Sequence, residues 1–400
     1  MKMIYQSTAG YFGAIFFALF AVLALAFDLS SFQSFFWSIF IIFVMMAIYE
    51  IRAQFLFFGG FHFSRDHRSF FTLARSAFVR WSVNFSVLCF CCFLVDDHRF
   101  FSAESFDFTR YFYHQILSIY FYFGFLYHFI ALRLRGGFHY DLGDYAILTL
   151  CAVRAIGKVR FNNRRIKKIL LVHLVNFFFL TLMISFFNNE FSSLKSSFSW
   201  FSAHHTATFF QYYHQSYLVI YHGIFVVDVG LAVISYTIAN RFLMNRTKSV
   251  DSSLYGWLVV LLCYPPMNSG FTAKFISYSG VSMPLPEWLL MFTMPIILAS
   301  FFVYVFATAA MGFKFSNLTN RGIVSIGPYR FFRHPAYIAK NFAWWVDNLQ
   351  VFNSFWAFVS IVFWTKIYLE RGITEEKHLS RDSAYCCYCA RVPRWFPRWQ

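Results

Sequence analysis

The stretch Gly327-Pro-Tyr-Arg-Phe-Phe-Arg-His-Pro-Ala-Tyr337 gathers Gly, two Pro, two Arg, a His and two Tyr within a chain otherwise dominated by 60 Phe residues. Proline suits the first turn of a helix and breaks a helix interior, so His334-Pro335 predicts a loop before it and a helix after it. This places Tyr329, Arg333 and His334 at the mouth of a helix, beside water. The ordered set favours a binding site over a simple connection.

The residues that follow predict a helical hairpin. Residues 338–368 are strongly apolar, yet charged residues lie on both sides of them. From Tyr337 to Glu375 there are 38 residues. At 1.5 Å per residue this is about 57 Å of helix, enough to cross a hydrocarbon core of about 30 Å and return. The polar stretch 347–354 lies near the middle, where the turn is required, so Glu375 is expected on the same side as His334.

The composition excludes an ordinary soluble domain. Hydrophobic residues make up 59% of the chain and charged residues only 13%, too few to cover a water-facing surface. We therefore expect an all-α, polytopic transmembrane bundle of about ten spans, ending in the hairpin and a cytoplasmic tail. The eight spans before the hairpin are predicted at 11–27, 35–58, 81–95, 113–132, 169–187, 215–238, 255–269 and 287–311.

The charged loops predict the orientation. The net charge of +16 comes from Lys and Arg in short loops between apolar spans, which indicates topology determinants and no nucleic-acid partner. Loop 59–80 and the run 154–168 are basic, whereas loop 96–110 is acidic. Both termini are then cytoplasmic in a multi-pass protein of the lipid bilayer. The first apolar run is either an uncleaved span or a cleaved signal peptide.

The motif and the tail together resemble the isoprenylcysteine carboxyl methyltransferase and phospholipid methyltransferase superfamily of integral membrane enzymes. The resemblance covers roughly residues 320–400. It is carried by Gly327-Pro-Tyr-Arg, Arg333-His-Pro-Ala-Tyr337, Arg371 with Glu375-Glu376, Tyr385, Tyr388 and Arg391-Val-Pro-Arg-Trp-Phe-Pro397. It implies a methyltransferase-like region at 313–400, preceded by a multi-span region of unknown role at 1–312.

The resemblance also implies a cofactor and a set of site residues. The cofactor is S-adenosylmethionine, and the acceptor is lipid-soluble or prenylated. The implied catalytic residues are Arg371, at the acceptor carboxylate, and Glu375. The implied cofactor-binding residues are Tyr329, Arg333, His334, Pro335, Tyr337, Glu375 and Glu376. Carboxylates suit the cationic groups of such a donor, Arg suits its carboxylate and aromatic rings suit adenine. No metal site is expected.

Two other functions remain open from the sequence. The tail is about two residues shorter than is usual in the superfamily, and eight spans before the hairpin are more than its methyltransferases usually carry. Sterol reductases, which use NADPH, are similar in length, span number and the ending Tyr388-Cys-Ala-Arg-Val-Pro393. A transporter or non-catalytic membrane protein with a degenerate tail is the third alternative, although ionisable residues within the spans, which would favour transport, are almost absent.

Overall fold

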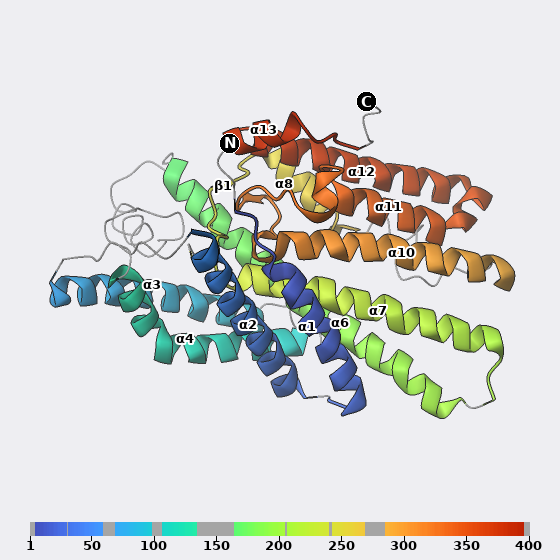
Figure 1. Ribbon diagram of the computed structural model, residues 1–400, viewed down its shortest axis with the longest axis horizontal. Helices are drawn as coiled ribbons and strands as arrows, with labels where there is room; N and C mark the ends of the chain where they lie inside the picture. Colours follow the sequence, from blue (N-terminus) through green and yellow to red (C-terminus); the bar gives the residue numbers. More distant parts are fainter. Residues whose placement is uncertain are drawn as a thin grey trace.

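The computed structural model describes residues 5–29, 31–58, 69–97, 106–133, 164–204, 206–239, 242–268 and 285–395. Among these residues the regular elements are helices, apart from one short strand pair, as Figure 1 shows. The predicted all-α, polytopic architecture is confirmed. The basic run 154–168 lies largely outside the described residues, as does the part of loop 59–80 before residue 69; from Phe70 onward that predicted loop is helical and belongs to α3 (Phe70–Asp97).

Seven helices in the described part of the chain are long and apolar enough to cross a membrane. They are α1 (Ala9–Ala26), α2 (Phe32–Phe58), α3 (Phe70–Asp97), α4 (Asp107–Arg133), α6 (Arg164–Ala203), α7 (Phe209–Thr237) and α10 (Glu287–Met311). Each contains one of the predicted spans or nearly coincides with it. Many of their large apolar side chains are exposed, for example Phe71, Tyr122 and Phe209, as expected of a surface that faces lipid.

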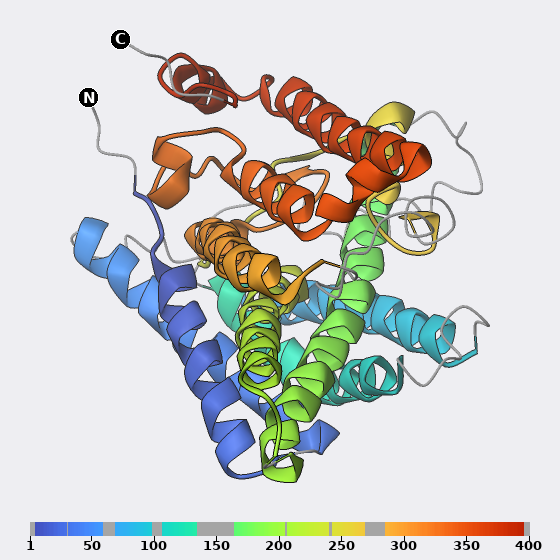
Figure 2. The same cartoon turned by 90° about the vertical axis from the view of Figure 1, so that its right-hand side faces the viewer.

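Successive pairwise contacts connect the helices of the N-terminal half to the C-terminal hairpin. α3 pairs with α4, α4 contacts α6, α6 lies along α7, and α7 lies along α10. α1 packs against both α7 and α10. At that contact Gly10 meets the backbone of Ala309 and Gly312 so closely that a Cβ atom would not fit. Figure 2 shows the C-terminal helices stacked above α10 and α7, so that these two helices form the floor beneath the site.

The predicted span 255–269 is not a membrane-crossing helix. Only α8 (Leu254–Leu261) is helical at its start, and eight residues span about 12 Å. The helix ends because Pro265-Pro266 follows, and proline lacks the N–H that a further turn needs. The Tyr213 hydroxyl of α7 donates to the Met291 carbonyl of α10, 2.8 Å away, near the start of each helix. These two helices therefore run in the same direction.

The predicted hairpin is confirmed. α11 (Pro335–Asp347) and α12 (Phe355–Leu379) are joined by the short 3-10 helix η5 (Leu349–Asn353), within the polar stretch chosen for the turn. The Ser354 side chain caps α12 by accepting from Ala357 N. α11 has 13 residues, about 20 Å, which is shorter than a complete crossing. The first arm is therefore too short to cross a hydrocarbon core by itself.

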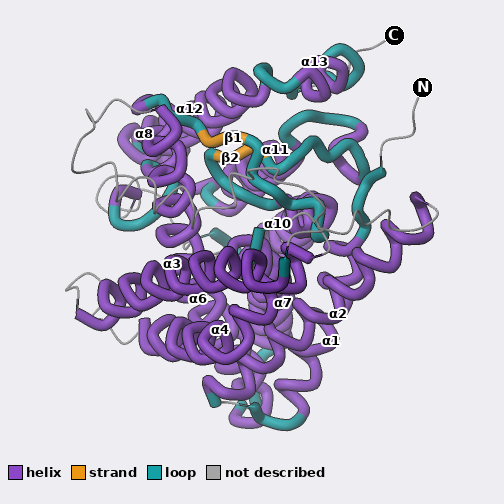
Figure 3. Tube along the Cα trace, turned by 90° about the vertical axis from the view of Figure 1, so that its left-hand side faces the viewer, coloured by secondary structure: helices purple, strands orange, loops and turns teal. Residues whose placement is uncertain are grey.

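A small cross-connection holds the tail against the bundle. β1 (Ser249–Val250) pairs antiparallel with β2 (Thr319–Asn320), as the strand-coloured trace of Figure 3 shows. Asp382, which caps α13 (Ser383–Cys389), accepts hydrogen bonds from Lys248 Nζ at 2.8 Å and Asn320 Nδ2 at 3.0 Å. The connection fixes the last helix beside the loop that precedes the site.

Candidate functional site

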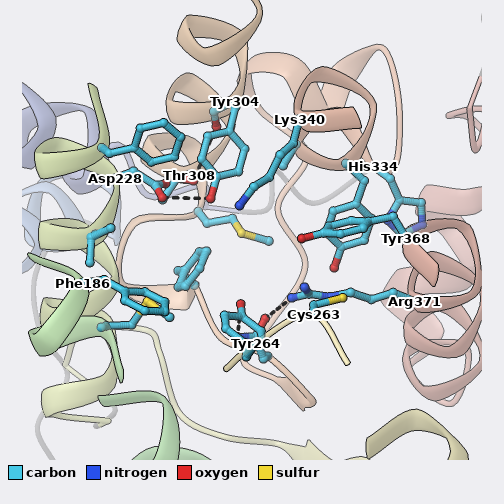
Figure 4. Close-up of a pocket in the computed structure, with 18 of the residues that line it drawn as sticks. Phe186, Asp228, Cys263, Tyr264, Tyr304, Thr308, His334, Lys340, Tyr368 and Arg371 are labelled. Atoms are coloured by element: carbon cyan, nitrogen blue, oxygen red, sulfur yellow. Dashed lines mark hydrogen bonds between the residues drawn. The ribbon is translucent and has the colours of Figure 1, made fainter. Parts of the chain in front are cut away.

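A cavity of about 370 Å³ lies where the hairpin meets α6, α7 and α10. Figure 4 shows side chains converging on it from several helices. Its wall includes six residues expected from the motif and tail: Tyr329, Arg333, His334, Tyr337, Arg371 and Glu375. The opposite part of the wall comes from α6, α7 and α10, including Phe186, Asp228 and Tyr304. We refer to the part lined by the motif and hairpin residues as the mouth, and to the part lined by α6, α7 and α10 as the deep end.

The loop at the mouth has the geometry that its sequence dictates. Gly327 begins the 3-10 helix η4 (Gly327–Arg330) with φ of +58°, a left-handed conformation that favours glycine. A Cβ atom there would also collide with the Tyr11 hydroxyl of α1. Pro335 occupies the first position of α11, as predicted, with His334 directly before it. The loop is thus fixed both by its own backbone and by the first span.

Glu375 and Tyr337 join the two arms of the hairpin at the cavity wall. The Tyr337 hydroxyl donates to Glu375 Oε2 across 2.8 Å, although 38 positions separate the residues. Oε1 has no hydrogen-bond partner among the described residues. The expectation that the returning helix brings Glu375 back to the start of α11 is therefore confirmed, and one carboxylate oxygen remains available.

Arg371 is buried within a ring of tyrosines. Its guanidinium carbon lies 5.1 Å from the ring centroid of Tyr337, 5.6 Å from that of Tyr264 and 5.7 Å from that of Tyr368. It also donates to Asn317 Oδ1. Among the residues that the structure describes, no carboxylate lies within ion-pair distance of it. Its charge is therefore held by aromatic faces and an amide, which leaves it able to bind an anionic group.

Glu376 follows Glu375 directly in the sequence, but its environment differs from that of Glu375. Its carboxylate accepts from Arg333 Nη1 at 2.6 Å, His334 Nε2 at 2.9 Å, and Arg394 through Nε at 2.9 Å and Nη2 at 2.8 Å. Glu376 does not line the cavity. We call this group of four residues the clasp, because it joins the loop, α12 and the tail.

The electrostatics of the clasp favour the ionised carboxylate. Glu376 lies in the charged last turns of α12, near the tail. Burial alone would raise its pKa, but hydrogen bonds from His334 and Arg394 and the charge of Arg333 outweigh burial and lower the pKa to about 2. The carboxylate is consequently charged at any physiological pH.

The tail closes over the clasp. Trp395 packs on His334 with 4.9 Å between ring centroids, and its ring would collide with any side chain larger than that of Gly372. The Tyr388 hydroxyl donates to the Tyr329 carbonyl at 2.7 Å. Arg333 N donates to the Pro393 carbonyl at 3.0 Å. The ending of the chain thus holds the loop that lines the mouth of the cavity.

The deep end contains ionisable groups that the sequence analysis did not select. Asp228, in the middle of α7, accepts from the Tyr304 hydroxyl of α10 at 2.8 Å through Oδ2. Lys340 of α11 extends towards this pair in Figure 4, with Nζ 5.0 Å from the centre of the Tyr304 ring. We call these three residues the deep cluster. The sequence did contain a signal for this site: Asp228 lies within a predicted span, and an acidic residue inside a span is a functional candidate by default.

Of the eight residues expected to form the site, the structure brings six to the cavity wall. Glu376 lies behind the wall in the clasp, and Pro335 sets the start of α11. Tyr368 lies one turn before Arg371 on α12 and was not selected. Asn317 and Tyr264, which also contact Arg371, were missed because they lie in distant parts of the chain. Only the fold places them together.

The comparison with known proteins agrees with the geometry. The cavity is lined by the loop, both arms of the hairpin and α6, α7 and α10 of a helical membrane protein. Residues 286–381 match the model of the Isoprenylcysteine carboxyl methyltransferase (ICMT) family, which confirms the resemblance for this region. The match covers α10, the loop and the hairpin, about a quarter of the chain. This region is therefore similar to a family of methyltransferases.

Neither a curated protein nor a solved structure matches the chain at a significant level.

Proposed function

We propose that this protein is an integral membrane methyltransferase that uses S-adenosylmethionine to methylate a lipid-soluble acceptor. The observation that carries the proposal is the convergence of the loop and both arms of the hairpin on one cavity, within the region similar to the methyltransferase family. The same similarity favours this reaction over reduction with NADPH.

The residues at the mouth fit the chemical parts of such a donor. The free oxygen of Glu375 and the faces of Tyr329 and Tyr337 suit cationic groups. Arg371, which has no carboxylate partner among the described residues, suits an anionic group of donor or acceptor. The cavity volume lies within the range of ordinary small-molecule sites.

The bound donor would supply an activated methyl group on a sulfonium. The contribution of the protein is then alignment, charge placement and exclusion of water. Arg371 would position the acceptor, Glu375 would orient the cationic end of the donor, and Trp395 with Tyr388 would keep the mouth covered. An acceptor that is already an anion needs no general base for this reaction.

We further propose that the mouth of the cavity and both termini face the cytoplasm. The basic loops support this orientation. The N-terminal segment lies at the mouth, since Gln6 Oε1 accepts from Ser325 N at 3.3 Å. Reporter proteins fused to either terminus should be protected from protease added outside intact cells, and cleavage of either one would reverse the orientation.

The decisive experiment is binding of S-adenosylmethionine and of NADPH to the detergent-purified full chain and to Glu375→Gln. This variant keeps the shape of the side chain and removes its charge. Loss of one charged, partly desolvated contact should weaken S-adenosylmethionine binding by about 2 to 4 kcal/mol, roughly 30- to 1000-fold. Glu370→Gln, on the same helix but outside the cavity wall, is the matched control and should bind normally.

Two results would contradict the proposal. If the parent protein binds NADPH and not S-adenosylmethionine, the site belongs to a reductase. If it binds neither, the C-terminal region is a degenerate remnant. Normal S-adenosylmethionine binding by Glu375→Gln would remove Glu375 from the site without removing the reaction.

A further inference from the structure

The deep cluster has hydrogen-bonding capacity that the protein does not use. Asp228 has only 6% of its surface exposed, and its Oδ1 atom has no hydrogen-bond partner among the described residues. The Lys340 ammonium contacts the rings of Tyr304 and Trp344, at 5.0 Å and 5.2 Å from the centroids, and forms no ion pair or hydrogen bond within the described chain. A buried polar group without a partner is costly, so such groups indicate a ligand.

The two charges are near each other but separate. No ion pair joins Lys340 to Asp228, since their charged atoms are more than 4.0 Å apart, yet both lie beside the Tyr304 side chain. The arrangement therefore offers one donor, the ammonium, and two acceptors, the Asp228 Oδ1 atom and the phenolic oxygen of Tyr304. Each side chain also lines the cavity.

The chemistry of the surroundings selects the group that fits. A carboxylate or phosphate would meet Asp228 and Glu190, which also lines the cavity. An ammonium would meet Lys340 and, from α12, Arg371. A hydroxyl is neutral, and it can accept from Lys340 while it donates to the Asp228–Tyr304 pair. The rest of the wall at this end, including Phe186 of α6 and Phe225 of α7, suits a hydrocarbon body.

We propose that the deep cluster is a subsite for a hydroxyl group, so that the acceptor is a hydroxylated lipid held at its hydroxyl by Asp228, Tyr304 and Lys340. The inference rests on the proposed function for the identity of the ligand as an acceptor, but the subsite itself does not require methyl transfer. A purely hydrocarbon tail would leave the deep cluster desolvated and unpaired, which is unfavourable.

The subsite is tested by the binding of three probes that have the same hydrocarbon chain: hexadecan-1-ol, hexadecane and 1-methoxyhexadecane. Trp344 and Trp364 line the cavity, so a change in tryptophan emission of the detergent-solubilised full chain reports occupancy. The alcohol should bind about 10- to 100-fold more tightly than the hydrocarbon, with the ether between them, because the ether only accepts. The titration is then repeated with hexadecylamine and hexadecanoate.

Variants assign the preference to the deep cluster. Asp228→Leu and Lys340→Met should each reduce the advantage of the alcohol to within about threefold of the hydrocarbon, in proteins with unchanged helical circular dichroism. Lys377→Met, on the exposed side of α12, should keep the full preference. Since two variants on different helices are compared, misfolding of one leaves the test intact.

Several outcomes overturn the subsite: equal binding of alcohol and hydrocarbon by the parent, an alcohol preference that survives both variants, or tighter binding of the amine or the carboxylate than of the alcohol. These are separate from failure of the proposed function. A protein that prefers the alcohol and does not bind S-adenosylmethionine would keep the subsite and lose the methyltransferase.

Discussion

The clasp and the deep cluster are two groups of charged side chains, one at the mouth and one at the deep end of the same cavity, and their hydrogen bonding differs. In the clasp, the Glu376 carboxylate accepts four hydrogen bonds from three side chains. In the deep cluster, Asp228 accepts one hydrogen bond and Lys340 makes none within the described chain. Glu376 and Asp228 are each 6% exposed, so exposure does not explain the difference between the two carboxylates.

The contrast separates a structural role from a binding role. A buried carboxylate with every lone pair occupied stabilises the fold and has no capacity left for a ligand. A buried carboxylate and ammonium that are both unsaturated reduce stability, and they persist where function requires them. Glu375 is intermediate, with one oxygen bonded to Tyr337 and one free. Adjacent residues on α12 thus serve different purposes.

The largest effect is expected from Glu376→Gln. Removing the charge leaves Arg333 and Arg394 without their carboxylate, and breaking a buried pair typically costs about 3 to 5 kcal/mol. We expect a lower midpoint of thermal unfolding and faster proteolysis of the tail after residue 380. Both can be measured on detergent-solubilised protein.

Glu370→Gln is the control for this comparison. Glu370 accepts from the Tyr255 hydroxyl at 3.1 Å near the surface, and the loss of such a contact should change stability by at most about 1 kcal/mol. Equal unfolding midpoints for the two variants would show that the clasp does not hold the tail.

A smaller effect, of opposite sign, is expected from Lys340→Met. The substitution replaces an unpaired cation by an apolar side chain of similar length in a mainly apolar wall. Burial of a cation without a hydrogen-bond partner is costly, and we expect a gain of about 1 to 2 kcal/mol in the free energy of unfolding when it is removed. Thermal unfolding without ligand measures it, with Lys366→Met on the exposed face of α12 as the control. A loss above about 1 kcal/mol would mean that Lys340 supports the fold.

The hairpin and most of the mouth could be predicted because their signals are local. Pro335 sets a helix start, the polar stretch 347–354 supplies a turn, and the number of residues between Tyr337 and Glu375 fixes the return. Each of these follows from backbone chemistry or helix rise within 50 consecutive residues.

The deep end could not be predicted in the same way. Its members come from three helices, and the sequence gives no measure of which face of α7 meets α10. Asp228 was recognisable as an acid within a span, but its pairing with Tyr304, 76 positions away, depends on packing. The short α8 was overestimated for a related reason: hydropathy counted the residues before Pro265-Pro266 without the break that the prolines impose.

The smallest expected effect concerns pH, and it tests the clasp through linkage. The folded-state pKa of Glu376 is about 2, below the ordinary value of 4.5, so its charge contributes stability that is fully present above pH 4.5 and is lost as the pH falls through 2.

The difference in unfolding midpoint between the parent and Glu376→Gln should therefore stay constant from pH 8 to pH 5. The difference should shrink below pH 4.5. There the Glu376 carboxylate of the parent gains a proton and loses its charge, whereas glutamine does not titrate. Scanning calorimetry of both proteins across this range measures the difference, and titrating groups that do not contact residue 376 cancel because they are common to both chains. A difference that already falls between pH 8 and pH 5 would indicate that the donors of the clasp, and not its carboxylate, control the closure of the tail.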